Sequence, residues 1–441
     1  MQVSVLDETA AIRQPHYPLV PGSIPHHYVD TKVRPTLEST RIIEAHLKTP
    51  QLISSSEGAF KKILFTIPSY AVHDPEQRKN PYKAIYMDLL HKLPEYVELI
   101  IIVNKGSEEA VQSWLQEVNR DEKSTIIVLP DNLHFSVWAE DAYSIVHDSD
   151  TNKHYFLEPL DFIRYADSMV AEYISNETEF DSLQTPLHFQ GGNILIGDTF
   201  FLIGADYPAL TLKYVNDTIL PSGDETPQQT VYHAYGQYLD TTRELFYVKS
   251  NVPVPIERSR RVTIGGELWT EHIYFGNIDG TQQPLFHIDM FVTLIGRNQT
   301  GKYVILVGSP KLAADLLAVP LWDHSMNDVF DSVAEQLRRD GFEVQRNPLP
   351  LAYFDDKETK TRQWYFCTYN NALVEQTPTS KKVWLPTFGY GEWGELQKTD
   401  LENKTLWESM GYQVIQITDC HVLASNLGVL HCIKKYLERS K

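Results

Sequence analysis

Short apolar strands and helices alternate along most of this chain, and that alternation restricts the fold more than any other feature of the sequence. Residues 63–68 (ILFTIP) have the composition of a buried strand. Asn80 followed by Pro81 predicts a helix start, and Pro94 ends that helix before a second apolar strand at 97–104 (VELIIIVN). A strand–helix–strand order is typical of mixed α/β folds, in which helices cover the faces of sheets.

The same alternation returns nearer the C-terminus. Residues 303–308 (YVILVG) predict a strand, and Ser325 is expected to begin a helix that stops at Gly341. No linker rich in Gly, Ser or Pro divides the chain. We therefore predict an N-terminal extension at 1–58 and one α/β domain at 59–441.

Charge and composition exclude several classes of function. The net charge of −19 argues against a nucleic-acid partner, because phosphate binding needs clustered Lys and Arg. No apolar run is long enough to span a membrane, and the first residues lack the pattern of a secretory signal. The three widely spaced cysteines form neither a disulfide framework nor a CxxC metal motif. We expect a cytoplasmic protein without a metal or a membrane partner; its oligomeric state is left open.

Polar residues interrupt the apolar pattern at five places, each in a different predicted strand–helix unit. Sites assembled from the loops of several units commonly form one central pocket. The five places are VWAEDAY (137–143, with Trp138, Glu140 and Asp141), FQGGNILIG (189–197, with Gln190 and Asn193), FHIDMFV (286–292, with His287 and Asp289), CTYNNALVE (367–375, with Asn371) and VLHCI (429–433, with Cys432).

Each place also has a structural explanation of its own. On a strand, His287 and Asp289 would project to one face, either as a solvated pair or as partners in a polar pocket. Cys432 within VLHCI could be a small buried hydrophobe. Only the combination of a thiol, a histidine and two carboxylates favours a catalytic site.

In their order along the chain, these motifs resemble the guanidino-group-modifying enzymes of the pentein fold, in particular agmatine deiminases and peptidylarginine deiminases. The resemblance rests on W-x-x-D (138–141), GGN (191–193), H-x-D (287–289), Y-x-N (369–371) and G-x-x-H-C-I (428–433). It implies five ββαβ modules around a pseudo-fivefold axis with a central active site. It also implies hydrolysis of a guanidinium group to a ureido group and ammonia, without a metal or organic cofactor.

The resemblance also implies roles for individual residues. Cys432 matches the nucleophile, His287 the general acid and base, and Asp289 and Asp141 the carboxylates that bind the guanidinium. The positions expected to shape the pocket or bind substrate are Trp138, Glu140, Gln190, Asn193 and Asn371.

The residue types fit that chemistry. A guanidinium is planar and permanently charged, and its paired N–H edges match carboxylates. Its central carbon is a poor electrophile, so a thiolate is a suitable nucleophile. Other activities remain open: a thiol hydrolase of amides or esters, an amidinotransferase with the same Cys–His–Asp set, or a guanidine-binding protein that has lost turnover.

Three positions depart from the pattern of the deiminases. Gln190 stands where agmatine deiminases and free-arginine deiminases usually have Glu, and Glu140 where they often have Arg. A single glycine, Gly428, remains of the glycine-rich run before the nucleophile. Gln190 favours arginine within a peptide or protein as substrate, with agmatine as the other candidate.

Overall fold

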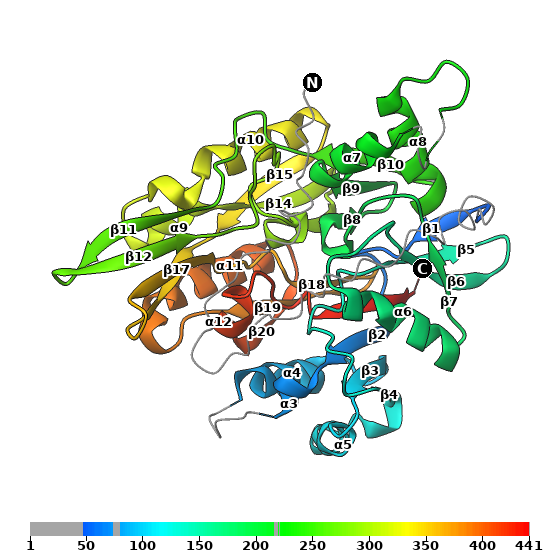
Figure 1. The fold of residues 1–441 in the computed structure, drawn as a ribbon, viewed down its shortest axis with the longest axis horizontal. Helices are drawn as coiled ribbons and strands as arrows, with labels where there is room; N and C mark the ends of the chain where they lie inside the picture. The colour runs from blue at the N-terminus through cyan, green and yellow to red at the C-terminus, as the bar shows by residue number, and fades with distance from the viewer. Residues whose placement is uncertain (1–46, 74–79, 216–218, 220, 441) are drawn as a thin grey trace.

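The computed structural model describes residues 47–73, 80–215, 219 and 221–440, and within them six β-sheets (Figure 1). One sheet shows the pattern that most of the others repeat. β13 (Val292–Arg297) runs antiparallel to β14 (Tyr303–Ser309), which runs parallel to β15 (Glu343–Pro348). The parallel crossover is made by α9 (Pro310–Leu317) and α10 (Asn327–Arg339). This is a ββαβ module.

Four more sheets follow the same order of one antiparallel and one parallel pair. Their elements are β5 (Ser144–Asp148), β6 (Lys153–Glu158), α6 (Tyr165–Glu177) and β7 (Asp181–Gln184); β8 (Ile194–Ile196), β9 (Phe200–Gly204), α7 (Asp206–Thr211), α8 (Pro227–Leu239) and β10 (Glu244–Val248); β18 (Leu373–Gln376), β19 (Lys381–Thr387), α11 (Gln397–Ser409) and β20 (Gln413–Asp419); and β21 (Lys434–Arg439), β2 (Phe60–Ile67), α3 (Ser69–Val72), α4 (Pro81–Lys92) and β3 (Glu98–Asn104), extended by α5 (Glu108–Glu117) and β4 (Ser124–Leu129).

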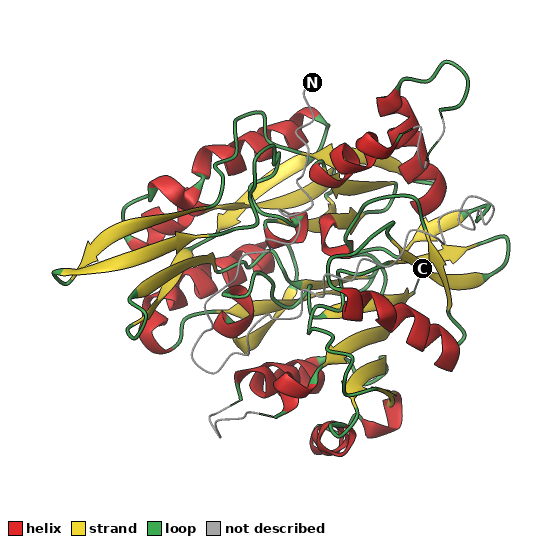
Figure 2. Cartoon of the chain, viewed as in Figure 1, coloured by secondary structure: helices red, strands yellow, loops and turns green. Residues whose placement is uncertain are grey.

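The sixth sheet lies outside this pattern. It joins the hairpin β11 (Arg258–Ile264) and β12 (Glu267–Ile273) to β17 (Thr361–Phe366) and β16 (Leu351–Asp356). The hairpin extends away from the body at the left of Figure 2, whereas α4 and α5 lie at the lower edge of the view.

The module that contains β2 is completed from the other end of the chain. β21 is its first strand and pairs antiparallel with β2. The Ala59 amide donates to the Ser440 hydroxyl at 2.7 Å, across 381 positions of sequence. In Figure 1 the red C-terminal strand accordingly lies beside blue β2.

Two of the predicted helix starts lie within the described residues. Asn80 caps α4 as expected, since its side chain accepts the Lys83 amide at 3.1 Å. The helix expected from Ser325 instead begins at Asn327. The reason is that Met326 adopts a left-handed conformation (φ 54°) and separates α10 from the 3₁₀ turn Asp323–Ser325.

Residues 47–58 pack against the body of the protein. β1 (Pro50–Leu52) pairs antiparallel with β5, and the Leu52 amide donates to Asp240 at 2.9 Å. The boundary at residue 58 stays a prediction, and residues 1–46 lie outside the described residues. None of the helices in the described ranges combines the length and the apolar character needed to cross a membrane.

Candidate functional site

The predicted site residues lie in five loops that share one structural position. Each loop comes directly before the first strand of a ββαβ module, so the five equivalent loops carry their side chains toward one another. The pairs of residue and following strand are Asp141 and β5, Asn193 and β8, Asp289 and β13, Asn371 and β18, and Cys432 and β21.

The spacing of His287 and Asp289 predicted that both lie on a strand, but in the structure neither does. His287 precedes a 3₁₀ turn, Ile288–Met290, which places Asp289 inside the turn before β13. The turn is held by Asn193, whose side-chain oxygen accepts the Ile288 amide at 3.0 Å. Because both sides of this short turn are buried, it produces the same continuous apolar pattern as a buried strand.

The Cys432 sulfur lies between an amide and a carboxylate. Asn371 Nδ2 donates to it at 3.1 Å, and the thiol faces Asp289 Oδ2 at 3.5 Å. Asn371 Oδ1 also accepts the backbone amides of Cys432 and Val429 at 3.1 and 2.9 Å. Burial, followed by the charges of Asp289 and Asp141, raises the pKa of the Cys432 thiol well above its usual value. The resting group is therefore a thiol.

Three polar side chains converge beside Gly192, at a narrow place that we call the gap, where even a Cβ would be crowded. A Cβ at this position would lie 2.7 Å from His287 Nδ1 and 3.3 Å from both Asp141 Oδ1 and Asp289 Oδ2. Asp141 Oδ1 and His287 Nδ1 are buried without a hydrogen-bond partner in the described part of the chain. They lie 3.7 Å apart, too far for a hydrogen bond. Unpaired buried groups are costly, so both atoms are suited to bind a polar ligand, which would need neighbouring side chains to move.

Gln190 determines which nitrogen of His287 faces that gap. His287 Nε2 donates to Gln190 Oε1 at 2.6 Å, which leaves Nδ1 as the nitrogen with the free lone pair. Burial lowers the pKa of His287 to about 4, outweighing the charge of Asp289. The resting imidazole is therefore a neutral base. Gln190, expected at the substrate, contacts the histidine in this structure.

Replacing Gln190 by Glu is expected to raise the pKa of His287. A carboxylate beside Nε2 favours the imidazolium, whereas the amide favours the neutral ring. An NMR titration of the histidine imidazoles in both proteins measures the shift. His421, which hydrogen-bonds to Tyr365 and the Phe388 carbonyl, serves as internal control and should titrate alike in both. An unchanged His287 titration would contradict the assignment.

Asp141 is held by an internal arginine. Arg164 Nη2 donates to Asp141 Oδ2 at 2.6 Å, and Arg164 Nε contacts Asp167 at 2.5 Å. Asp167 in turn accepts the Ser136 amide and hydroxyl, both at 2.6 Å. Burial raises the pKa of Asp141 to about 6, although Arg164 opposes the rise. Arg164 thus occupies one oxygen of Asp141 and leaves Oδ1 for the gap.

Glu140 points away from the gap, into a cluster with two lysines. Lys434 Nζ and Lys435 Nζ lie 2.7 and 2.9 Å from its two oxygens, and all three residues are buried. The Glu140 amide donates to the Cys432 carbonyl at 3.1 Å. Burial would raise the pKa of Glu140, but the ammonium groups lower it to about 2. The cluster joins the Asp141 loop to the Cys432 segment.

Trp138 and Asn193 each support a segment of the site through contacts with other protein groups. The Trp138 ring packs on the Gly428 backbone beside Cys432, so any side chain at 428 would overlap the ring. Asn193 accepts from Gln283 Nε2 at 2.9 Å and thereby supports the loop that leads to His287. A substrate-binding role for either residue stays a prediction.

Several residues around the site were given no role from the sequence. Arg164 lies in an ordinary DFIR run that carries no signal. His431 stands in the G-x-x-H-C-I motif, directly before Cys432, but was given no role; it contacts Asp289 through Nδ1 at 2.8 Å. Lys434 and Lys435 could have been found from the sequence. Two consecutive lysines in the apolar run IKKYL indicate buried charges that need a partner.

The described residues contain no group of three or more His, Cys, Asp or Glu side chains that could hold a metal ion. The other two cysteines, Cys367 and Cys420, are buried and contact neither His287 nor Asp289 through any hydrogen bond in the described residues.

The fold matches solved structures although the sequence does not match known families. No family model matches the chain, and no curated protein does. Agmatine deiminase from C. jejuni superposes with a TM-score of 0.55 at 12% identity, over 90% of this chain and 98% of that one. A second structure, described as a putative peptidyl-arginine deiminase, gives 0.55 at 14% identity over 89% and 99%. The chain has the pentein fold. The five ββαβ modules predicted from the resemblance are confirmed, and the β11–β12–β17–β16 sheet lies outside them.

Proposed function

We propose that this pentein-fold protein hydrolyses a guanidinium group to a ureido group and ammonia, with Cys432 as nucleophile. One observation carries the proposal: Asp141 Oδ1, Asp289 Oδ2 and the neutral Nδ1 of His287 face the same gap beside the sulfur. Two carboxylates and a hydrogen-bond acceptor complement a planar cation with N–H groups on every edge. A thiol hydrolase of amides would need the histidine but has no use for a second carboxylate.

The first half of the reaction forms a covalent intermediate. A bound cation favours thiolate over thiol, and the thiol proton passes to His287 Nδ1. The sulfur attacks the central guanidinium carbon, and His287 returns the proton to one amino nitrogen of the tetrahedral adduct. The C–N bond breaks, ammonia leaves, and an S-alkylthiouronium remains on Cys432.

The second half regenerates the enzyme. Water attacks the thiouronium carbon while His287 Nδ1 accepts its proton. The C–S bond then breaks, the sulfur recovers a proton, and the ureido product leaves. Because Cys432 is 2% exposed and His287 is fully buried, substrate reaches the sulfur only when neighbouring side chains move.

The preferred substrate is an arginine side chain in a peptide or protein, with agmatine second. Gln190 supports this order, since it holds His287 and supplies no third carboxylate at the gap. The two matched structures are named as deiminases of these two kinds of molecule.

A substrate panel tests the function. Agmatine, free arginine and an arginine-containing peptide are assayed for ureido product and ammonia, with and without an acceptor amine. We expect ammonia without any acceptor and the fastest turnover for the peptide. Turnover only with an acceptor amine would instead establish an amidinotransferase. Binding of a guanidine without turnover of any of the three would refute the hydrolase.

The pH profile provides a separate prediction about Asp141. Its pKa of about 6, raised by burial, means that the carboxylate loses its charge as the pH falls through that value. We expect kcat/KM to fall roughly tenfold per pH unit below about pH 6, because the protonated acid no longer attracts the cation. His287, with a pKa of about 4, cannot produce this limb. A profile that is flat down to about pH 5, with full recovery on return to neutral pH, would contradict the assignment.

A further inference from the structure

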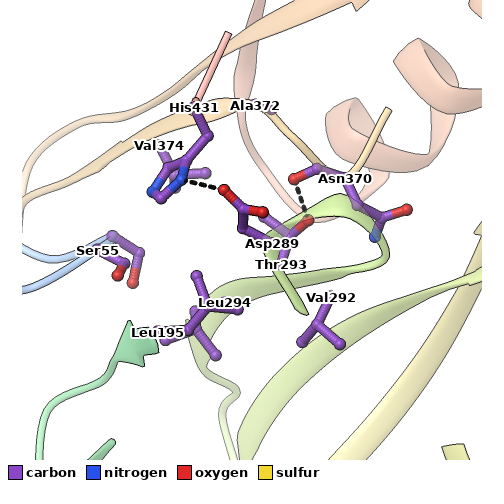
Figure 3. A pocket seen from close by; sticks show the side chains of 11 residues that line it. Ser55, Leu195, Asp289, Val292, Thr293, Leu294, Asn370, Ala372, Val374 and His431 are labelled. Atoms are coloured by element: carbon purple, nitrogen blue, oxygen red, sulfur yellow. Dashed lines mark hydrogen bonds and ion pairs between the residues drawn. The ribbon is translucent and has the colours of Figure 1, made fainter. Parts of the chain in front are cut away.

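His431 contacts the carboxylate that lies closest to the nucleophile. It directly precedes Cys432, is 5% exposed, and its Nδ1 donates to Asp289 Oδ2 at 2.8 Å (Figure 3). His431 has no role in the proposed proton transfers. A buried imidazole hydrogen-bonded to a reactive carboxylate therefore needs an explanation.

One oxygen of Asp289 makes all of its contacts to the site. Oδ2 accepts from His431, faces the Cys432 thiol at 3.5 Å and lies 3.3 Å from the position of a Cβ at Gly192. Oδ1 is buried and has no hydrogen-bond partner within the described ranges. The orientation of this carboxylate thus decides whether the gap has a negative charge next to the sulfur.

The backbone fixes the imidazole relative to the nucleophile. The His431 amide donates to the Asn371 carbonyl at 3.2 Å, and the Cys432 amide to the Asn371 side chain at 3.1 Å. Consecutive residues are therefore held by one asparagine, which places the imidazole and the sulfur in a constant relation.

Open space beside Asp289 makes the hydrogen bond to His431 necessary. A small cavity is lined by both residues and by Ser55, Leu195 and Thr293, among others (Figure 3). A carboxylate without a hydrogen-bond donor could turn toward this cavity. The gap would then lose the charge of this carboxylate.

We propose that His431 is a positioning residue for Asp289: its Nδ1–H holds Oδ2 in the orientation that faces Cys432 and the substrate gap. The inference rests on the proposed function in that Asp289 is taken to bind a cation. It makes His431 responsible for the attraction of cations to this site, with no proton transfer of its own.

Two alkylating reagents measure that attraction without any turnover. 2-Chloroacetamidine is a cation and 2-chloroacetamide its neutral counterpart, so the ratio of their labelling rates at Cys432 reports the negative charge beside the sulfur. The matched variants are His431→Leu and His431→Asn, which have similar shape, but only asparagine places an N–H donor near the position of Nδ1. Mass spectrometry of the Cys432 peptide gives both rates.

We expect His431→Leu to lower the ratio at least about 10-fold, as loss of a partner that orients a functional group typically does. His431→Asn should keep the ratio within about 3-fold of the wild type. A purely structural role would slow both reagents alike in either variant.

An unchanged ratio in His431→Leu would overturn the inference, and so would equal losses in His431→Leu and His431→Asn. If the leucine variant does not fold, His431→Gln replaces it, because its amide nitrogen lies near Nε2 and cannot reach Asp289 in the same way. A wild type that prefers the amidine but turns over no guanidine would refute the proposed function and leave this inference standing.

Discussion

Replacing Cys432 by serine is expected to lower kcat for ureido formation by on the order of 10⁴-fold or more, since loss of a covalent nucleophile removes the whole reaction path. Serine preserves the size of the side chain and can still accept from Asn371 Nδ2, which now lies 3.1 Å from the sulfur. The free energy of unfolding should therefore change by less than about 1 kcal/mol. Product formation and urea unfolding of the same preparation measure both quantities.

The other two cysteines are the controls for this experiment. Cys367 and Cys420 are fully buried, and burial raises the pKa of both thiols well above the usual value. Cys367→Ala and Cys420→Ala should keep kcat within about 3-fold of the wild type, since no reacting atom is lost. 2-Chloroacetamidine should label Cys432 first. Faster labelling of either other cysteine, or a Cys432→Ser enzyme with substantial turnover, would remove Cys432 from the nucleophile position.

Replacing Glu140 by glutamine is expected to cost about 3–5 kcal/mol of stability at pH 7, because two buried ammonium groups lose the carboxylate with which they pair. Glutamine keeps the shape and the amide contact to Cys432. Burial already lowers the pKa of Lys434 to about 8, and loss of Glu140 lowers it further. In the variant, the unfolded chain then binds a proton that the folded protein does not, so its stability rises with pH and the loss shrinks toward pH 9. Urea unfolding at both pH values tests this.

An exposed ion pair provides the comparison for Glu140→Gln. Lys311 and Asp315 lie 2.8 Å apart with side chains 58% and 61% exposed. Lys311→Gln should cost no more than about 0.5 kcal/mol at either pH, since water screens such a pair. If Glu140→Gln costs as little as Lys311→Gln at pH 7, the buried cluster does not join the Asp141 loop to the Cys432 segment in solution.

The strand–helix–strand order of several segments could be predicted from the sequence pattern, whereas the five ββαβ modules were implied by the family resemblance. Strands such as β3 and helices such as α4 are local features, and their hydrophobic period and caps are visible in single segments. The turn at His287–Asp289 could not be predicted this way. Because this turn is buried on both sides, its neighbouring residues are as apolar as those of a buried strand, and the sequence pattern does not distinguish the two.

The side chains that lie together could be singled out from the sequence as a set, but their partners could not; their roles stay a prediction. Cys432, His287 and the two aspartates are recognisable because one chemistry needs all of them. Arg164 and His431 act through hydrogen bonds to Asp141 and Asp289, and such pairings depend on tertiary contacts that no local pattern records. The prediction that Glu140 binds substrate remains untested, although both of its oxygens contact lysines here.

The pairing of β21 with β2 has a consequence for how the protein is made. A ribosome delivers β2 hundreds of residues before β21, so the module that both strands build stays incomplete throughout most of translation. Cys432 is synthesised just before β21, whereas its neighbours Glu140 and Asn371 belong to modules that have already been synthesised. The thiol therefore joins His287 and the carboxylates only when β21 pairs with β2. A chain that stops before Cys432 contains His287 and the two aspartates without the thiol.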